Sequence, residues 1–104
     1  MNPWVLVLIA GLMETAWALG LKYSEGFTRP LPSALTVVGA LISFWLLSMA
    51  MKELPVGTAY AVWVGIGAVG TAIAAVFLFG DPVTPLRVLG IALIVAGIAA
   101  LQFG

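Results

Sequence analysis

The chain has 104 residues, of which 63% are hydrophobic and 8% are charged, and its formal net charge is zero. Soluble domains carry about 25% charged residues, so this composition excludes an ordinary soluble domain and is typical of an integral membrane protein. The sequence contains no Cys and no His, which excludes disulfides and thiolate chemistry and removes the commonest metal ligand. We therefore expect no metal, no cofactor, no nucleic-acid partner and no enzymatic activity.

Polar clusters divide the chain into apolar segments. The clusters lie at about residues 22–33, 52–55 and 80–84. Because a helix needs about 20 apolar residues to cross the hydrocarbon core, the pattern predicts an all-α integral membrane protein with four transmembrane helices. They are expected within one domain, 1–104, at about residues 3–21, 34–51, 55–79 and 85–103. Four short helices are too few to enclose a two-sided polar pathway, so we expect a dimer.

The first segment carries a carboxylate, Glu14, near its middle. A charge at membrane depth costs at least ~2.5–3.5 kcal/mol, and the usual reasons for it are an ion path, a proton relay or a cationic ligand. Helical spacing places Ala10, Gly11, Trp17 and Ala18 around Glu14, which gives small residues for close approach and an indole N–H donor. The alternative is that Glu14 is a protonated, inert group that bonds a neighbouring helix.

In the second segment, one helical face carries Thr36, Gly39, Ser43 and Leu47. On this face the Ser43 hydroxyl could bond the carboxylate of Glu14. Ser and Thr in membrane helices often bond their own backbone instead, so this alternative stays open.

One face of the third segment carries aromatic residues followed by glycines. Tyr60 and Trp63 lie on adjacent turns and can donate hydrogen bonds and offer π surface to a cation. Aromatic residues also form interfacial belts, which is the alternative role for this pair. Gly65 and Gly67 lie in the middle of the segment and predict either a hinge or plain close packing.

In the fourth segment, Thr84 and Pro85 predict the helix start. Gly90 and Gly97 then belong to a stripe with a spacing of three and four residues. Small residues let membrane helices approach closely, so we expect this helix to serve assembly and to form the dimer contact.

Positive charges are distributed almost evenly between the two sides of the membrane. The first and third loops carry Lys22, Arg29 and Arg87, and the opposite side carries Lys52 and the α-amino group. The bias would place both termini outside, but it is weak enough to leave insertion in both orientations open.

Together these features resemble the small multidrug resistance (SMR) family over the whole chain. The resemblance is carried by Glu14, by residues 22–29 and 59–63, and by Gly65, Gly67, Gly90 and Gly97. Within the family, residues 55–60 and Trp17 are similar to the guanidinium exporter subtype, because the branch that exports quaternary ammonium compounds typically has glycine at the tryptophan position.

The resemblance implies a proton-coupled antiporter that exports guanidinium or small substituted guanidinium cations. It also implies an antiparallel, dual-topology homodimer that spans the inner (plasma) membrane of a bacterium. In each subunit Glu14 would bind either protons or the exported cation. The other site residues would be Trp17, Ser43, Tyr60 and Trp63. The same resemblance makes Gly65 and Gly67 a hinge that bends differently in the two subunits, and Gly90 and Gly97 a dimer contact.

Other functions remain as alternatives. A multidrug exporter of quaternary ammonium and other lipophilic cations would use the same glutamate. A non-transporting assembly factor would tolerate replacement of Glu14, and one half of a hetero-oligomeric pump would be inactive without its partner.

Overall fold

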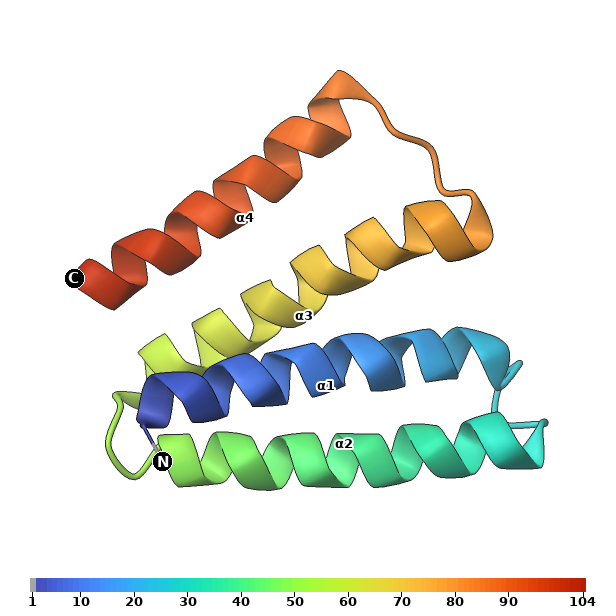
Figure 1. Ribbon diagram of the computed structural model, residues 1–104, viewed down its shortest axis with the longest axis horizontal. Coiled ribbons are helices and arrows are strands. Elements are labelled where there is room, and N and C mark those ends of the chain that lie inside the picture. The colour runs from blue at the N-terminus through green and yellow to red at the C-terminus, as the bar shows by residue number, and fades with distance from the viewer. Residues whose placement is uncertain (1) are drawn as a thin grey trace.

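The computed structural model describes residues 2–104, which form four helices joined by short loops (Figure 1). Each helix is long and apolar enough to cross a membrane, which confirms the all-α prediction. The helices are α1 (Pro3–Tyr23), α2 (Pro30–Ala50), α3 (Val56–Phe79) and α4 (Pro85–Phe103).

The caps of α1 and α4 follow directly from the sequence. Asn2 accepts a hydrogen bond from the backbone N–H of Trp4 at 2.8 Å, and proline follows at the first helical position. Thr84 accepts from the backbone N–H of Arg87 at 3.1 Å, and this confirms the predicted start of the fourth helix. These side chains satisfy backbone donors that a helix start leaves without an intrahelical partner.

The second helix begins at Pro30, four residues before the predicted start at 34. Arg29 has extended backbone angles, φ −95° and ψ 118°, and the proline that follows occupies the first turn, where its missing N–H costs nothing. The Ser33 hydroxyl donates to the Arg29 carbonyl at 2.6 Å, within that turn. The polar composition of this stretch suggested a loop, but its prolines and serine suit a helix start.

The loop between α1 and α2 is held by Ser24, whose side chain is buried. Its hydroxyl donates to the Leu21 carbonyl at 2.7 Å and accepts from the Phe27 N–H at 3.2 Å. Glu25, Gly26 and Phe27 have left-handed φ values of 50°, 72° and 65°. The chain therefore reverses direction within a few residues, and α2 returns directly along α1.

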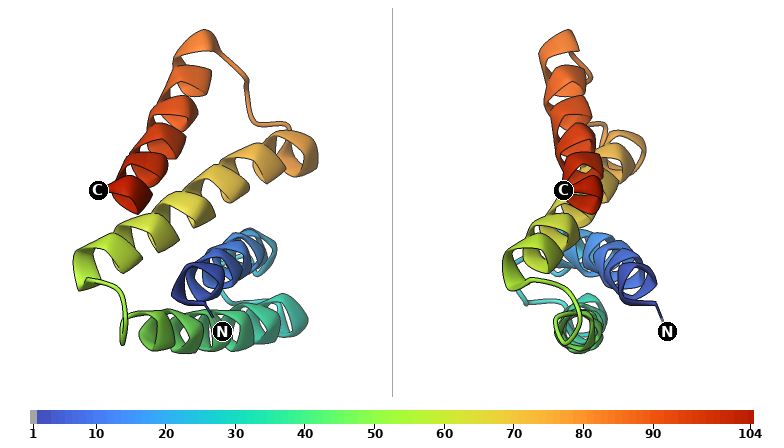
Figure 2. Two further views of the ribbon diagram at one scale, coloured as in Figure 1. Left: turned by 60° about the vertical axis from the view of Figure 1, so that its left-hand side comes forward. Right: turned by 90° about the vertical axis from the view of Figure 1, so that its left-hand side faces the viewer.

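The helices lie across the flat molecule in the order α2, α1, α3, α4 (Figures 1 and 2). Both termini and the α2–α3 loop lie at one end, and the other two loops lie at the opposite end. The buried core belongs to α1, α2 and α3, with α1 between the other two helices. Its hydrophobic cluster consists of Leu6, Val7, Ala10, Leu47, Ala50, Ala59, Val62 and Trp63.

The fourth helix is arranged differently. Among the described residues, α4 contacts α3 and no other helix, and it has no buried residue. It diverges from the rest of the molecule toward its N-terminal end (Figure 1). The chain is therefore a three-helix core with one apolar helix attached to its side.

Candidate functional site

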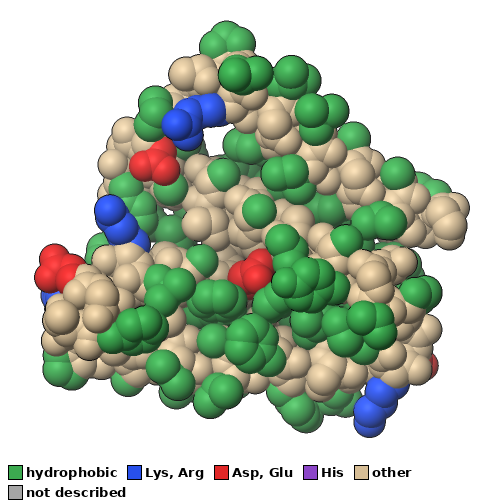
Figure 3. Space-filling model, turned by 180° about the vertical axis from the view of Figure 1, so that it is seen from behind, with side chains coloured by type: hydrophobic (Ala, Val, Ile, Leu, Met, Phe, Trp, Pro, Cys, Tyr) green, Lys and Arg blue, Asp and Glu red, His purple; other side chains and the backbone are tan. Residues whose placement is uncertain are grey.

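Glu14 lies in the middle of α1 and faces α3. Within residues 2–104 it is the one Asp or Glu inside a helix, because the other three acids lie in loops. Figure 3 shows one acidic side chain near the centre of an otherwise largely apolar face, while the other charged side chains lie at the margins. This carboxylate is therefore separated from the charged ends of the helices.

The carboxylate of Glu14 opens into a cavity of about 450 Å³ between α1 and α3. Among the described lining residues there is no Lys or Arg, so no cation of the chain's own occupies the cavity with Glu14. Asp81 lines the end of the cavity at the α3–α4 loop. The remaining lining residues are Trp17, Ala18, Val64, Gly67, Ala68, Thr71, Ala72 and Ala75.

Gly67 of α3 lies directly against the Glu14 carboxylate. A methyl group at Gly67 would overlap the carboxylate oxygen, so a larger residue here would displace the Glu14 side chain from its present position. Gly65 approaches α4 instead, and a methyl group there would lie 2.8 Å from the Ile98 side chain. The structure thus uses both glycines for close packing within one continuous helix, and the hinge remains a prediction.

Ser43 joins the three core helices and is fully buried. Its hydroxyl donates to the Ala10 carbonyl of α1 at 2.7 Å and accepts from the Trp63 indole N–H of α3 at 3.0 Å. The structure therefore pairs Ser43 with the α1 backbone and Trp63, not with the carboxylate of Glu14. The face predicted for the second segment is confirmed, because Thr36 and Leu47 are buried along with Ser43.

The aromatic residues form a row that connects α3, α2 and α1. Tyr60 and Trp63 have ring centroids 5.7 Å apart, Trp63 and Phe44 also 5.7 Å, and Phe44 and Trp17 6.1 Å. Trp63 is 6% exposed and lies in the helical core, whereas Tyr60 is 54% exposed. Core burial of Trp63 argues against a membrane-interface belt for this residue.

Phe44 is the residue that sequence reasoning missed. It supplies the link in this row between the two tryptophans predicted for the site. The available signal was its position next to Ser43, which was predicted to reach Glu14 of the first helix. Phe44 does not belong to the face formed by Thr36, Gly39, Ser43 and Leu47, and only packing shows that its ring reaches the row.

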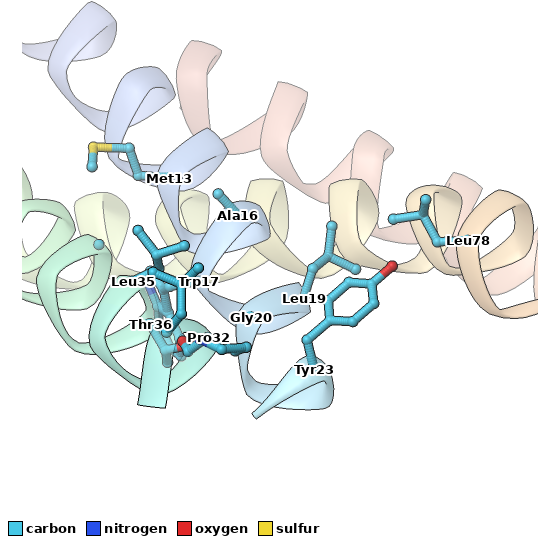
Figure 4. Close-up of a pocket in the computed structure, with 12 residues that line it drawn as sticks. Met13, Ala16, Trp17, Leu19, Gly20, Tyr23, Pro32, Leu35, Thr36 and Leu78 are labelled. Atoms are coloured by element: carbon cyan, nitrogen blue, oxygen red, sulfur yellow. The ribbon is translucent and has the colours of Figure 1, made fainter. Parts of the chain in front are cut away.

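The indole N–H of Trp17 is buried without a hydrogen-bond partner among the described residues. Trp17 lines the Glu14 cavity and also a second cavity of about 540 Å³ between α1 and α2 (Figure 4). The second cavity is almost entirely apolar, with Leu35, Pro32 and Met13 among the residues that line it. Trp17 therefore lies between a carboxylate cavity and an apolar one.

Gly90 and Gly97 lie away from these cavities. A methyl group at either glycine would meet no atom within 4 Å in the described part of the chain. These two glycines of α4 are therefore not used for close packing against the described part of their own copy, unlike Gly65 and Gly67.

These features define a small, multi-pass membrane protein with one partly buried carboxylate halfway along its helices. The family model described as Small Multidrug Resistance protein matches residues 2–94, and the chain belongs to this family. Three relatives are named guanidinium exporters and come from Citrobacter freundii, Salmonella typhimurium strain LT2 and Escherichia coli strain K12. They are 56%, 57% and 54% identical to this chain over 99 residues, which is 95% of this chain and 94% of each relative.

The family and the four apolar helices make this a multi-pass protein of the bacterial inner membrane. Its named relatives are exporters, in agreement with the expectation that the chain is not an enzyme.

Proposed function

We propose that this protein exports guanidinium in exchange for protons, with Glu14 as the group that binds both. The observation that carries the proposal is the Glu14 carboxylate in a cavity whose described lining supplies no positive charge. A carboxylate at membrane depth is expensive unless it binds a cation or a proton. The names of relatives at 54–57% identity identify guanidinium as the first cation to test.

The chemistry of the cation suits the cavity. Guanidinium is planar and presents paired N–H donors that fit a carboxylate bidentately. The aromatic row ends at Trp17 beside this cavity and offers π surface to a cation. The apolar cavity on the other side of Trp17 can take the substituent of a small substituted guanidinium.

Exchange follows from competition for one carboxylate. When guanidinium is bound, Glu14 cannot hold a proton, and a protonated Glu14 has lost the charge that attracts the cation. If the site opens alternately to the two sides, mutually exclusive binding couples export of the cation to entry of protons. In this proposal bending at Gly65 and Gly67 changes the side to which the cavity opens.

The transporting unit in this proposal is an antiparallel homodimer. The supporting observations are that α4 has no buried residue and that Gly90 and Gly97 touch nothing within their own copy, as judged from the described residues. Small residues on an exposed membrane helix favour helix–helix contact. A second, inverted copy would contribute a second Glu14 and enclose the cavity that one copy leaves open.

The test is guanidinium uptake into vesicles that contain the purified protein and have an acidic interior. We expect concentrative uptake that collapses when the proton gradient is removed. Guanidinium binding should weaken as the pH is lowered, since protons compete for Glu14. Gradient-independent uptake, or binding that does not respond to pH, would contradict the exchange mechanism.

A second candidate is export of quaternary ammonium compounds, and the apolar cavity beside Trp17 favours it. A quaternary ammonium ion has no N–H donors for the carboxylate, so we expect weak competition with guanidinium. Competition by a bulky aromatic quaternary ammonium at concentrations similar to guanidinium itself would favour the second candidate.

A further inference from the structure

Thr15, the residue after Glu14, makes a contact that the proposed function does not use. Its hydroxyl lies 3.4 Å from the Gly67 carbonyl of α3 and 3.4 Å from the Gly11 carbonyl of its own helix. In the described structure, each pair of core helices is joined by one hydrogen bond that involves a side chain. Those of the other pairs involve Ser43, and this one joins α1 to α3.

The contact lies at the level of the carboxylate. Gly67, whose carbonyl faces Thr15, is the same residue whose α-carbon lies against Glu14. One turn further along α3, a methyl group at Gly70 would overlap the Thr15 hydroxyl. Glu14 and Thr15 therefore sit together on a Gly67–Gly70 surface of α3, and no side chain on those two positions separates the helices.

We propose that Thr15 is a positioning residue for Glu14: its hydroxyl holds Gly67 of α3 against α1 and so sets the space available to the cation at the carboxylate. This inference rests on the proposed function, because it assumes that Glu14 binds the transported cation. The side chain of Thr15 itself points at backbone carbonyls and not at the cavity, whose lining does not include it.

The two acceptors explain how such a contact can coexist with movement of α3. A threonine in a membrane helix can bond the carbonyl four residues earlier. When α3 moves away at Gly67, the hydroxyl remains bonded to Gly11, and no buried donor is left without a partner. Thr15 thus favours the close arrangement without locking the helices together.

The test compares Thr15→Val, which keeps the shape and removes the hydroxyl, with Thr15→Ser, which keeps the hydroxyl. Guanidinium affinity is measured on purified protein by tryptophan fluorescence, and KM and maximal rate are measured in vesicles. We expect Thr15→Val to raise both the Kd and the KM by about 2- to 10-fold, the factor of one net hydrogen bond. The maximal rate per molecule should change less than twofold, and Thr15→Ser should stay close to the unmodified protein.

A purely structural role would lower the amount of active protein and leave Kd and KM unchanged, and this result would overturn the inference. So would a Thr15→Ser variant as impaired as Thr15→Val. If the valine variant does not fold, Thr15→Ala against Thr15→Ser is the replacement pair, since the two differ by one oxygen atom. Ser48→Ala is the matched control, because the Ser48 hydroxyl donates at 2.6 Å to a carbonyl of its own helix.

The two proposals fail separately. If the unmodified protein does not bind or transport guanidinium, the proposed function is wrong. If the unmodified protein transports it and Thr15→Val has the same Kd and KM, the role of Thr15 is wrong and the transport function stands.

Discussion

The helices of the three-helix core and α4 have a similar amino-acid composition, but they differ in how much of their surface is buried. Both are strongly apolar, and both contain glycines at helical spacing. In the core, Gly67 and Gly70 lie against Glu14 and Thr15, whereas Gly90 and Gly97 of α4 meet nothing within the described part of their own chain. Glycine spacing thus predicts close approach of helices in a membrane, but it does not tell whether the approach occurs within one copy or between two.

The largest expected effect concerns the carboxylate in the core. Glu14→Gln removes the charge that balances the cation and the group that binds protons, so we expect guanidinium export to fall by at least about 30-fold. The measurement is the rate of guanidinium uptake into vesicles that contain the variant. Glu53→Gln, in the exposed α2–α3 loop, is the control and should transport normally. Transport that survives Glu14→Gln would remove the basis of the mechanism.

The next effect concerns close approach inside the core. In Gly67→Ala the added methyl group overlaps the Glu14 carboxylate, and overpacking of this kind costs about 1–3 kcal/mol. We expect guanidinium affinity to fall about 10-fold or more, as measured by fluorescence titration. Gly57→Ala is the matched control on α3, because a methyl group there meets no described atom within 4 Å. Equal affinities in the two variants would contradict the contact between Gly67 and the carboxylate.

The corresponding experiment on α4 tests contact between copies. Gly97 is exposed on a helix without buried residues, and a Cβ there meets no described atom within 4 Å, so Gly97→Leu should leave the three-helix core intact. Loss of a close membrane-helix contact should weaken dimerisation by about 10-fold. Light scattering of the purified protein measures the dimer fraction, and thermal unfolding checks the core. A dimer fraction equal to that of the unmodified protein would exclude this face of α4 from the interface.

The smallest effect concerns the hydrogen bond between α2 and α3. Trp63→Phe removes the indole donor to Ser43, and we expect a coupling of about 1 kcal/mol in a double-mutant cycle with Ser43→Ala. Thermal unfolding in detergent measures the stability of the unmodified protein, of the two single variants and of the double variant. Additive effects of the two substitutions would show that this bond contributes nothing to the core.

Much of the site could be predicted from residue types, but the pairings could not. Ser43 was expected on the face toward the first helix, and it lies there, fully buried. Its partners are the Ala10 carbonyl and the Trp63 indole, not Glu14. Helical periodicity assigns a side chain to a face, whereas the partner depends on the relative height and rotation of two helices.

By itself the sequence determined four apolar segments of membrane-spanning length, a lone carboxylate in the first of them, and the caps that start α1 and α4. These features depend on local composition and on the 3.6-residue period, which act over one or two turns. The early start of α2 at Pro30 and the turn around Ser24 are also local in origin. Tertiary packing decided the place of Phe44 in the aromatic row and the approach of Gly67 to Glu14. It also decided that Gly65 and Gly67 are covered whereas Gly90 and Gly97 are exposed, because this depends on which helices meet. A helix with small residues on one face can meet any neighbour of matching shape.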